Sequence, residues 1–275
     1  MATRKQTGTM KAIQTILITL FTVFLLLVSC ASDDSSNDNN VAQIKSIVRQ
    51  EYYGDQWYNN QKTTFYYEGN NTMMSSSLLQ NSSSQTWTDY IRSNYTLSDS
   101  NHASQQIDLK WNIQTGMWVN YMRHTFTYNA QGKVVKEEQE IWTPDNNWIL
   151  RYKIDYIYDN NTFLISKEYS EWYAASSLWG AFDKYVYTNN AEGKPVNTEF
   201  INNGETFYNE TTTYDINGFF LMSEQQSQAF DGSTYVNLRT EQTTKSNGNI
   251  NVITKTFYES DGTISQRRRF LYEYY

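Results

Sequence analysis

The chain has 275 residues, with 22 Lys and Arg against 29 Asp and Glu, so its formal net charge is −7. This acidic balance argues against nucleic acid or an anionic lipid surface as the main partner. A single Cys and two His exclude a disulfide framework, a multi-cysteine metal site and a His-rich metal centre. No sequence motif indicates a cofactor or a metal site.

Residues 1–29 are predicted to be an export signal. Arg4, Lys5 and Lys11 form a basic start, and the uncharged, mostly apolar stretch 12–28 follows. A helix of that length spans roughly 25 Å, which is short for a membrane helix. The next feature, Leu27-Val28-Ser29-Cys30, resembles the lipobox of bacterial lipoproteins. The resemblance implies that Cys30 is lipidated and begins the mature chain; an uncleaved membrane anchor is the alternative.

Residues 30–40 are predicted to be a disordered acidic tether. They consist largely of Ser, Asp and Asn and hold no large apolar side chain to bury. Ser32-Asp33-Asp34, close behind the lipobox Cys, resembles the surface-export signal of Bacteroidota lipoproteins. We therefore expect attachment to the outer membrane through the lipid, with the protein on the cell surface rather than on the periplasmic face.

Aromatic residues define a repeat of about thirty residues in the remainder of the chain. Intervals of 30, 31, 30 and 31 residues separate five Trp, and the series continues at intervals of 28 with Phe207 and Tyr235; the Trp are Trp57, Trp87, Trp118, Trp148 and Trp179. Ten residues after three of the Trp, a Tyr precedes turn-forming Asn, Asp or Gly; these are Tyr67, Tyr128 and Tyr158. Less regular copies of this pattern, a Tyr followed by turn-forming residues, begin at Tyr187, Tyr214 and Tyr258.

The segments between the turns are predicted to be β-strands. From Trp148 to Tyr158 apolar and polar residues alternate with a period of two. The second segment of each repeat is polar, as in 136–140 and 223–228, and has little to bury on either face. We expect residues 41–275 to form one all-β domain, a long antiparallel meander of about 14–16 strands. The meander would curl into a wide soluble barrel or an open coiled sheet, with a water-accessible concave side.

The repeat resembles two known groups of proteins. Tyr214-Asp215-Ile216-Asn217-Gly218 is similar to the tyrosine–aspartate repeats of RHS-type proteins. The lipobox together with tandem β-hairpins resembles Bacteroidota lipoproteins with a porin-like soluble β-sheet fold. This second resemblance covers about residues 50–275, and it implies a fold without implying any catalytic residue.

Candidate catalytic groups are few. His102 is expected in an exposed loop and His124 in a strand, so each is expected to be a solvated or strand-face side chain rather than a catalytic one. Paired carboxylates are what a polysaccharide hydrolase needs, and three pairs lie close in sequence; they are Asp155 with Asp159, Glu168 with Glu171, and Glu137 with Glu138. We expect these acids to make the sheet soluble instead.

Two further charged features are expected to be structural. The Asp and Asn residues of the hairpin turns could hold Ca²⁺, but they lack the spacing of an EF-hand and are predicted to form the turns. Arg267, Arg268 and Arg269 lie in the last predicted strand, where alternation points Arg268 away from the other two. We expect a solvated edge there rather than an anion site.

The aromatic ladder is the one feature that could bind a ligand. Trp and Tyr rings can stack on sugars or receive apolar groups, although packing of the sheet also explains them. The leading hypothesis is a non-enzymatic binding or scaffold module for a glycan or an envelope protein. The alternatives are a surface polysaccharide hydrolase and a purely structural envelope protein.

The lipobox yields a direct prediction. Growth with labelled palmitate should label the wild-type protein, whereas Cys30→Ala should carry no label because the acylated thiol is absent. Labelling of Cys30→Ala at the wild-type level would contradict the lipobox assignment.

Overall fold

The computed structural model describes residues 42–69, 71–81, 84–98, 102–229, 232–244 and 249–275. They form sixteen strands and no helix, so none of the described residues belongs to a helix that could cross a membrane. The strands are β1 (Ile44–Tyr53), β2 (Gln56–Glu68), β3 (Asn71–Gln80), β4 (Trp87–Leu97), β5 (Ala103–Asn112), β6 (Met117–Tyr128), β7 (Val134–Trp142), β8 (Trp148–Tyr158), β9 (Leu164–Tyr173), β10 (Leu178–Asn189), β11 (Pro195–Asn202), β12 (Glu205–Tyr214), β13 (Phe220–Gln228), β14 (Thr234–Thr244), β15 (Ile250–Tyr258) and β16 (Ile264–Tyr274).

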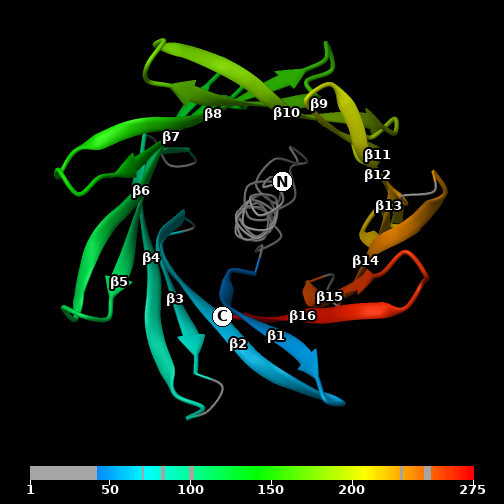
Figure 1. Cartoon of the computed structure of the whole chain (residues 1–275), viewed down its shortest axis with the longest axis horizontal. Coiled ribbons are helices and arrows are strands. Elements are labelled where there is room, and N and C mark those ends of the chain that lie inside the picture. Colours follow the sequence, from blue (N-terminus) through cyan, green and yellow to red (C-terminus); the bar gives the residue numbers. More distant parts are fainter. Residues whose placement is uncertain (1–41, 70, 82–83, 99–101, 230–231, 245–248) are drawn as a thin grey trace, which may run out of the picture. The chain divides into compact units, whose positions relative to one another are not determined.

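The strands form a closed antiparallel barrel. Each strand pairs with its neighbours in the chain, and β1 pairs with β16, where Ile47 lies opposite Tyr272 (Figure 1). The predicted all-β meander is therefore confirmed, and closure selects the barrel over the open sheet. Closure leaves no unpaired strand edge. The signal, the lipobox and the tether lie outside the described residues.

A β-bulge interrupts the alternation of β8. The register slips by one residue at Arg151, which stands between the partners of Gln139 and Glu140. Trp148 consequently lies on the opposite face of the sheet from Ile154. The unbroken alternation predicted for this strand is therefore wrong at Arg151, because an extra residue in one strand exchanges the faces beyond it.

The same bulge recurs in the even-numbered strands from β2 to β14. The extra residues are Asn60, Tyr90, Tyr121, Arg151, Phe182, Phe207 and Asn237. In β2, β4, β6, β8 and β10 the bulge follows the repeat Trp by three residues. Phe207 is itself a bulge residue, and Tyr235 pairs with Ser227 on the opposite face from the Trp. These two aromatic residues thus continue the sequence interval of the repeat, but they do not occupy the place of the Trp three residues before the bulge.

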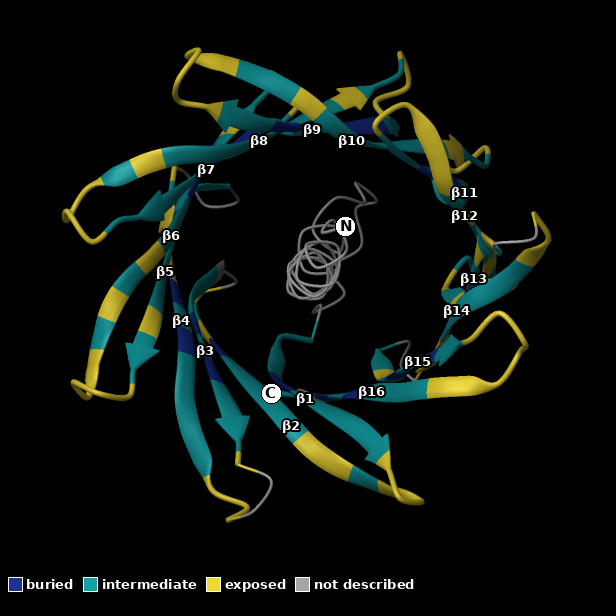
Figure 2. Cartoon of the chain, in the orientation of Figure 1, coloured by how far each residue is buried: buried dark blue, intermediate teal, exposed yellow. Residues whose placement is uncertain are grey.

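The two faces of the barrel wall differ in exposure (Figure 2). In β12, Tyr208 and Glu210 are half-buried, whereas Asn209 and Thr211 are exposed. Side chains crowd on a concave surface, so we assign the less exposed face to the inside of the barrel and call it the inner wall. The pairing register then shows which side chains of each strand lie on the inner wall. A barrel of sixteen strands encloses more space than its own side chains fill.

Tryptophan pairs and cations connect the strands on the outer wall. Edge-to-face pairs form across three hairpins, with ring centroids 5.3 Å, 5.0 Å and 5.1 Å apart; they are Trp111–Trp118, Trp142–Trp148 and Trp172–Trp179. A cation from two strands earlier lies over the second Trp of each pair, at 4.6 Å, 4.9 Å and 5.5 Å from the ring centroid; these cations are Arg92, Arg123 and Lys153. Each such group links three consecutive strands.

The repeat Tyr fastens the hairpins at one rim of the barrel. A Tyr hydroxyl near the end of β2, β6, β8 and β12 donates to a carbonyl at the start of the preceding strand; the pairs are Tyr67 with Ile44, Tyr128 with Ala103, Tyr158 with Val134 and Tyr214 with Pro195. In β10 the side-chain amide of Asn189 makes the equivalent bond, to Leu164. Asn189 rather than Tyr187 therefore occupies the repeat position there.

The residue after the repeat Tyr shapes the turn. The Oδ1 atom of Asp159 accepts backbone N–H groups from Asn161 and Phe163, at 2.9 Å and 2.8 Å. Asp215 accepts the equivalent pair in its own turn, where Gly218 has a φ of 76°. A left-handed backbone at this position favours Gly. The turn-forming role predicted for these residues is therefore confirmed.

We expect Tyr158→Phe to lower the free energy of unfolding by about 1 kcal/mol, because the Val134 carbonyl loses a donor while the ring is kept. Chemical denaturation followed by Trp fluorescence measures the change. The control is Tyr66→Phe, since Tyr66 lies on the outer wall and is 45% exposed. Equal losses in the two variants would contradict the fastening role.

Candidate functional site

The repeat Trp do not form the candidate site. Trp57, Trp87, Trp118, Trp148 and Trp179 all lie on the outer wall, before the bulge of their strand. Four of them are held in aromatic pairs with a cation above the ring, since Trp57 pairs with Tyr52 beneath Arg269. The side chains that converge on the inner wall come from other positions of the repeat.

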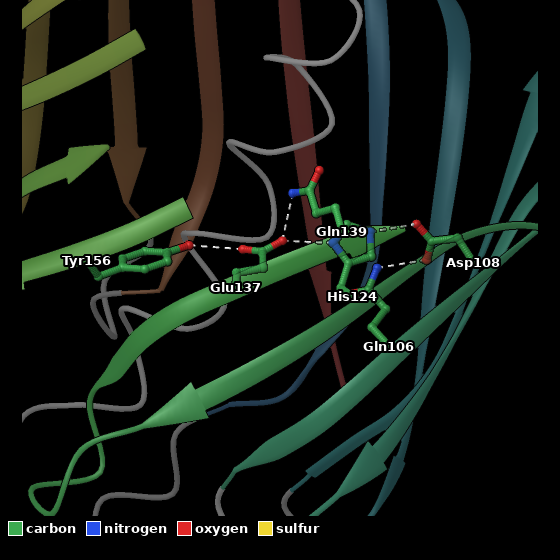
Figure 3. A network of polar contacts seen from close by, with 6 residues as sticks. All are labelled: Gln106, Asp108, His124, Glu137, Gln139 and Tyr156. Carbon is green, nitrogen blue, oxygen red and sulfur yellow. Dashed lines mark hydrogen bonds and ion pairs between the residues drawn. The ribbon is translucent and has the colours of Figure 1, made fainter. Parts of the chain in front are cut away.

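A chain of charged and polar side chains crosses the inner wall of β5 to β8 (Figure 3). The Nδ1 atom of His124 lies 2.8 Å from Oε1 of Glu137, and its Nε2 atom lies 3.5 Å from Oδ2 of Asp108. The second contact is an ion pair without hydrogen-bond geometry. The imidazole thus lies between two carboxylates, which are 13 residues away in the next strand and 16 residues away in the preceding one.

Each carboxylate is held by further donors. The Gln139 amide donates to Oε1 of Glu137 at 2.8 Å, and the Tyr156 hydroxyl donates to Oε2 at 3.0 Å. The Gln106 amide donates to Oδ1 of Asp108 at 2.7 Å. Glu137 is only 2% exposed, so these bonds replace the water that a carboxylate needs. The strand register explains the convergence, because Gln106, His124 and Gln139 lie opposite one another in β5, β6 and β7.

The two carboxylates keep His124 protonated. Burial alone lowers the pKa of His124, but the adjacent charges of Asp108 and Glu137 outweigh burial and raise that pKa to about 10. Burial likewise opposes ionisation of Asp108, yet His124 holds the pKa of Asp108 below its ordinary value. A protonated imidazole cannot serve as a general base at neutral pH. The prediction that His124 lies in a strand is confirmed, and its strand face turns inward after the bulge at Tyr121, so the side chain is buried rather than solvated.

Lys167 extends the network along β9. The side chain is 3% exposed, and its Nζ atom lies 5.3 Å from the ring centroid of Tyr156 and 6.0 Å from that of Tyr187. Burial lowers the pKa of Lys167 to about 7, an effect that the charge of Glu137 partly offsets. A lysine buried between aromatic rings makes cation–π contacts when it is charged, so Lys167 is not a solubilising surface lysine.

Beside Lys167, aromatic rings form a continuous surface that we call the tyrosine wall. Its members are Tyr169 in β9, Tyr185 and Tyr187 in β10, Phe200 in β11 and Tyr208 in β12. Successive centroids from Tyr169 through Tyr185 and Phe200 to Tyr208 are 5.6 Å, 4.8 Å and 5.0 Å apart. The Tyr rings are half-buried, so part of each faces the space inside the barrel. Such rings combine an apolar face with a polar hydroxyl.

The predicted carboxylate pairs do not come together. Glu137 is on the inner wall and Glu138 on the outer wall; Glu171 is on the inner wall and Glu168 on the outer wall. Asp155 is on the outer wall, whereas Asp159 is engaged in its turn. No pair therefore shares a face. The described residues also contain no group of His, Cys, Asp and Glu suited to a metal ion.

The network of Asp108, His124 and Glu137 was not anticipated from the sequence. The signal that could have found it is the constant position of the bulge three residues after the repeat Trp, but the residue type at the bulge varies and does not identify it as a bulge. His102, the other His, lies against the ring of Tyr128, with ring centroids 4.7 Å apart, near a rim of the barrel.

The fold is similar to known solved structures, although no protein-family model and no curated protein matches the sequence. A porin-like protein from Bacteroides uniformis has a TM-score of 0.51 and 9% identity, over 84% of this chain and 98% of that one. A porin-like protein from Bacteroides vulgatus has a TM-score of 0.36 and 9% identity, over 85% and 99%. A Bacteroides fragilis protein of unknown function has a TM-score of 0.39 and 17% identity, over 46% and 91%. The first likeness confirms the porin-like fold alone.

Lys167 should carry a pH-dependent cost of folding. An unfolded lysine has a pKa of about 10.4, and burial lowers the pKa of Lys167 to about 7. The cost is therefore greatest below about pH 7 and disappears as the pH rises toward about 10. We expect Lys167→Met to raise the free energy of unfolding at about pH 6, with the gain shrinking toward zero by about pH 10.

His124 contributes the opposite slope. Its pKa is raised to about 10, so its stabilisation is complete below the unfolded pKa of about 6.5 and is lost as the pH rises through about 10. In Lys167→Met, stability should therefore fall over this interval. Lys184→Met, which removes an exposed outer-wall lysine, is the control and should follow the wild type in denaturation curves at each pH. A pH-independent effect of Lys167→Met would refute the assignment.

Proposed function

We propose that this protein is a lipid-anchored protein of the bacterial outer envelope that binds a carbohydrate on the inner wall of its barrel. The lipobox at Leu27 to Cys30 and the acidic tether support the anchor and favour the cell surface. The porin-like fold of a Bacteroides protein is consistent with an envelope location. A lipid anchor would hold the barrel at the membrane, because two or more acyl chains bind a bilayer almost permanently.

The tyrosine wall is the observation that carries the proposal. It presents several aromatic rings in a row, with Lys167 and the Glu137 network beside them. Sugars offer apolar C–H faces that stack on aromatic rings and hydroxyls that need hydrogen-bond partners. A wall with both ring faces and polar groups satisfies both requirements.

Binding fits this inner wall better than hydrolysis does. A glycosidase requires one carboxyl group that is protonated at the working pH and a second carboxylate placed a few ångströms away. The pKa of Asp108 lies below its ordinary value, so Asp108 is not such an acid. Glu137 already receives three hydrogen bonds from His124, Gln139 and Tyr156.

Affinity electrophoresis of the full-length protein in detergent tests the proposal. Gels containing xylan, mannan, amylose or chondroitin sulfate should show retardation of the wild-type protein in at least one. Tyr187→Ala should weaken that retardation by about tenfold in apparent affinity, equivalent to about 1.4 kcal/mol. The matched control Tyr66→Ala removes an outer-wall Tyr and should bind as the wild type does.

Two outcomes would contradict carbohydrate binding by the inner wall. Equal weakening in the Tyr187 and Tyr66 variants would place the contact elsewhere, and no retardation in any gel would favour a purely structural envelope protein. Assay of reducing ends in the same mixtures separates binding from hydrolysis. Their release by the wild type, lost in Glu137→Gln with the barrel intact, would establish the hydrolase instead.

A further inference from the structure

A second set of charged side chains lies on the inner wall of β15, β16 and β1. Lys255, Arg268 and Glu51 form one row across these three strands, since Arg268 pairs with both Lys255 and Glu51. Arg49 lies two residues from Glu51 on the same face of β1. Alternation places Arg268 on the inner wall and Arg267 and Arg269 on the outer wall, as predicted. The barrel closes here, however, so the expected solvated edge does not exist.

This set holds three cations, and two of them share a single carboxylate. The Oε1 atom of Glu51 lies 3.6 Å from Nε of Arg268 and 3.9 Å from Nη2 of Arg49. Within the described part of the chain, no carboxylate comes within ion-pair distance of Lys255. Glu51 therefore compensates at most one of the three positive charges at close range.

The guanidinium groups are held in place but remain incompletely bonded. Arg268 lies over the ring of Phe257, at 5.1 Å from its centroid, and Arg49 donates to the side chain of Asn60. The Nε atoms of both Arg are buried, and neither has a hydrogen-bond partner among the described residues. A buried N–H without an acceptor is costly, and a charged one more so.

Repulsion between the cations adds to this cost. Burial lowers the pKa of Arg49, and Arg268 lowers it further despite the opposing charge of Glu51. Burial also lowers the pKa of Lys255, with Arg268 adding to the effect and the more distant Glu210 opposing it. A bound anion would remove the repulsion and supply acceptors to the free N–H groups.

We infer that Arg49, Lys255 and Arg268 form an oxyanion-binding site on the inner wall, which takes a sulfate or carboxylate group of the ligand. Guanidinium groups match the geometry of such oxyanions, and the lysine supplies a further positive charge. The oxyanion site also extends the proposed function: the carbohydrate that binds the inner wall is an acidic one. This extension rests on the proposed function. The oxyanion site itself stands independently of that extension.

Inorganic sulfate is the first probe, used with the full-length protein in detergent at constant ionic strength. Isothermal titration should detect sulfate binding to the wild type, and sulfate should raise its melting temperature. Lys255→Met and Arg268→Gln should each weaken binding by about tenfold or more, the loss expected for one charge-assisted contact. Lys184→Met makes the same change of charge on the outer wall and should bind sulfate as the wild type does.

The melting temperature of the same variants shows whether a loss of sulfate binding is caused by unfolding. Lys255→Met should melt no lower than the wild type without sulfate, because it removes a buried repulsion. Absence of sulfate binding to the wild type, or equal binding by Lys255→Met and Lys184→Met, would overturn the oxyanion site.

A chondroitin sulfate hexasaccharide and neutral maltohexaose then separate the two hypotheses. Tighter binding of the sulfated oligosaccharide, lost in Arg268→Gln, supports an acidic ligand. Binding of maltohexaose alone would leave the proposed carbohydrate function standing and refute the acidic one. Binding of sulfate with neither oligosaccharide would support the oxyanion site and contradict carbohydrate binding.

Discussion

Closure of the sheet between β1 and β16 is the constraint on which the rest of the structure depends. Many strands of this chain are too polar to be held by burial of apolar surface, as the half-buried Glu, Gln and Ser of β7 and β13 show. Backbone pairing of every strand on both sides compensates for this, because a closed ring has no edge whose N–H and C=O groups go unpaired. Closure also separates an inner wall from an outer wall, and every functional argument follows from that separation.

The recurrent bulge lets the even-numbered strands from β2 to β14 contribute side chains to both walls. Before the bulge, Trp148 faces outward and contributes to an aromatic pair that a cation covers. After the bulge, Ile154 and Tyr156 of the same strand face inward. A single repeat can therefore place its aromatic pairs on the outer wall and its polar network on the inner wall. The aromatic pairs stabilise the wall, so the inner side chains remain available for the proposed ligand.

Charge is distributed unevenly along the inner wall. Around β5 to β9, Asp108 and Glu137 enclose His124 in a network with satisfied carboxylates. Half the ring away in strand order, Arg268 and Lys255 lie beside one shared Glu51. Water screens such charges poorly when they are buried, so the proposed ligand would meet different electrostatic environments in the two regions. The network around His124 has its hydrogen bonds completed within the barrel and is therefore preorganised. The cations around Arg268 lack a full set of counter-charges, which a bound anion would supply.

The sequence by itself determined the all-β class, a meander of about 14–16 strands and the turns that follow the repeat Tyr. Those features are local: the spacing of Trp148 from Trp179, and the Asp and Gly of the Tyr214 turn, report hairpin lengths and backbone conformation directly. Only the tertiary structure decided which residues face inward. One extra residue at Arg151 or Tyr121 exchanges the two faces of a strand. It keeps a constant distance from the repeat Trp, but the residue type at the bulge varies and does not reveal that the register slips there. His124 and Arg268 therefore acquired their partners through register and closure, which bring together strands far apart in the chain.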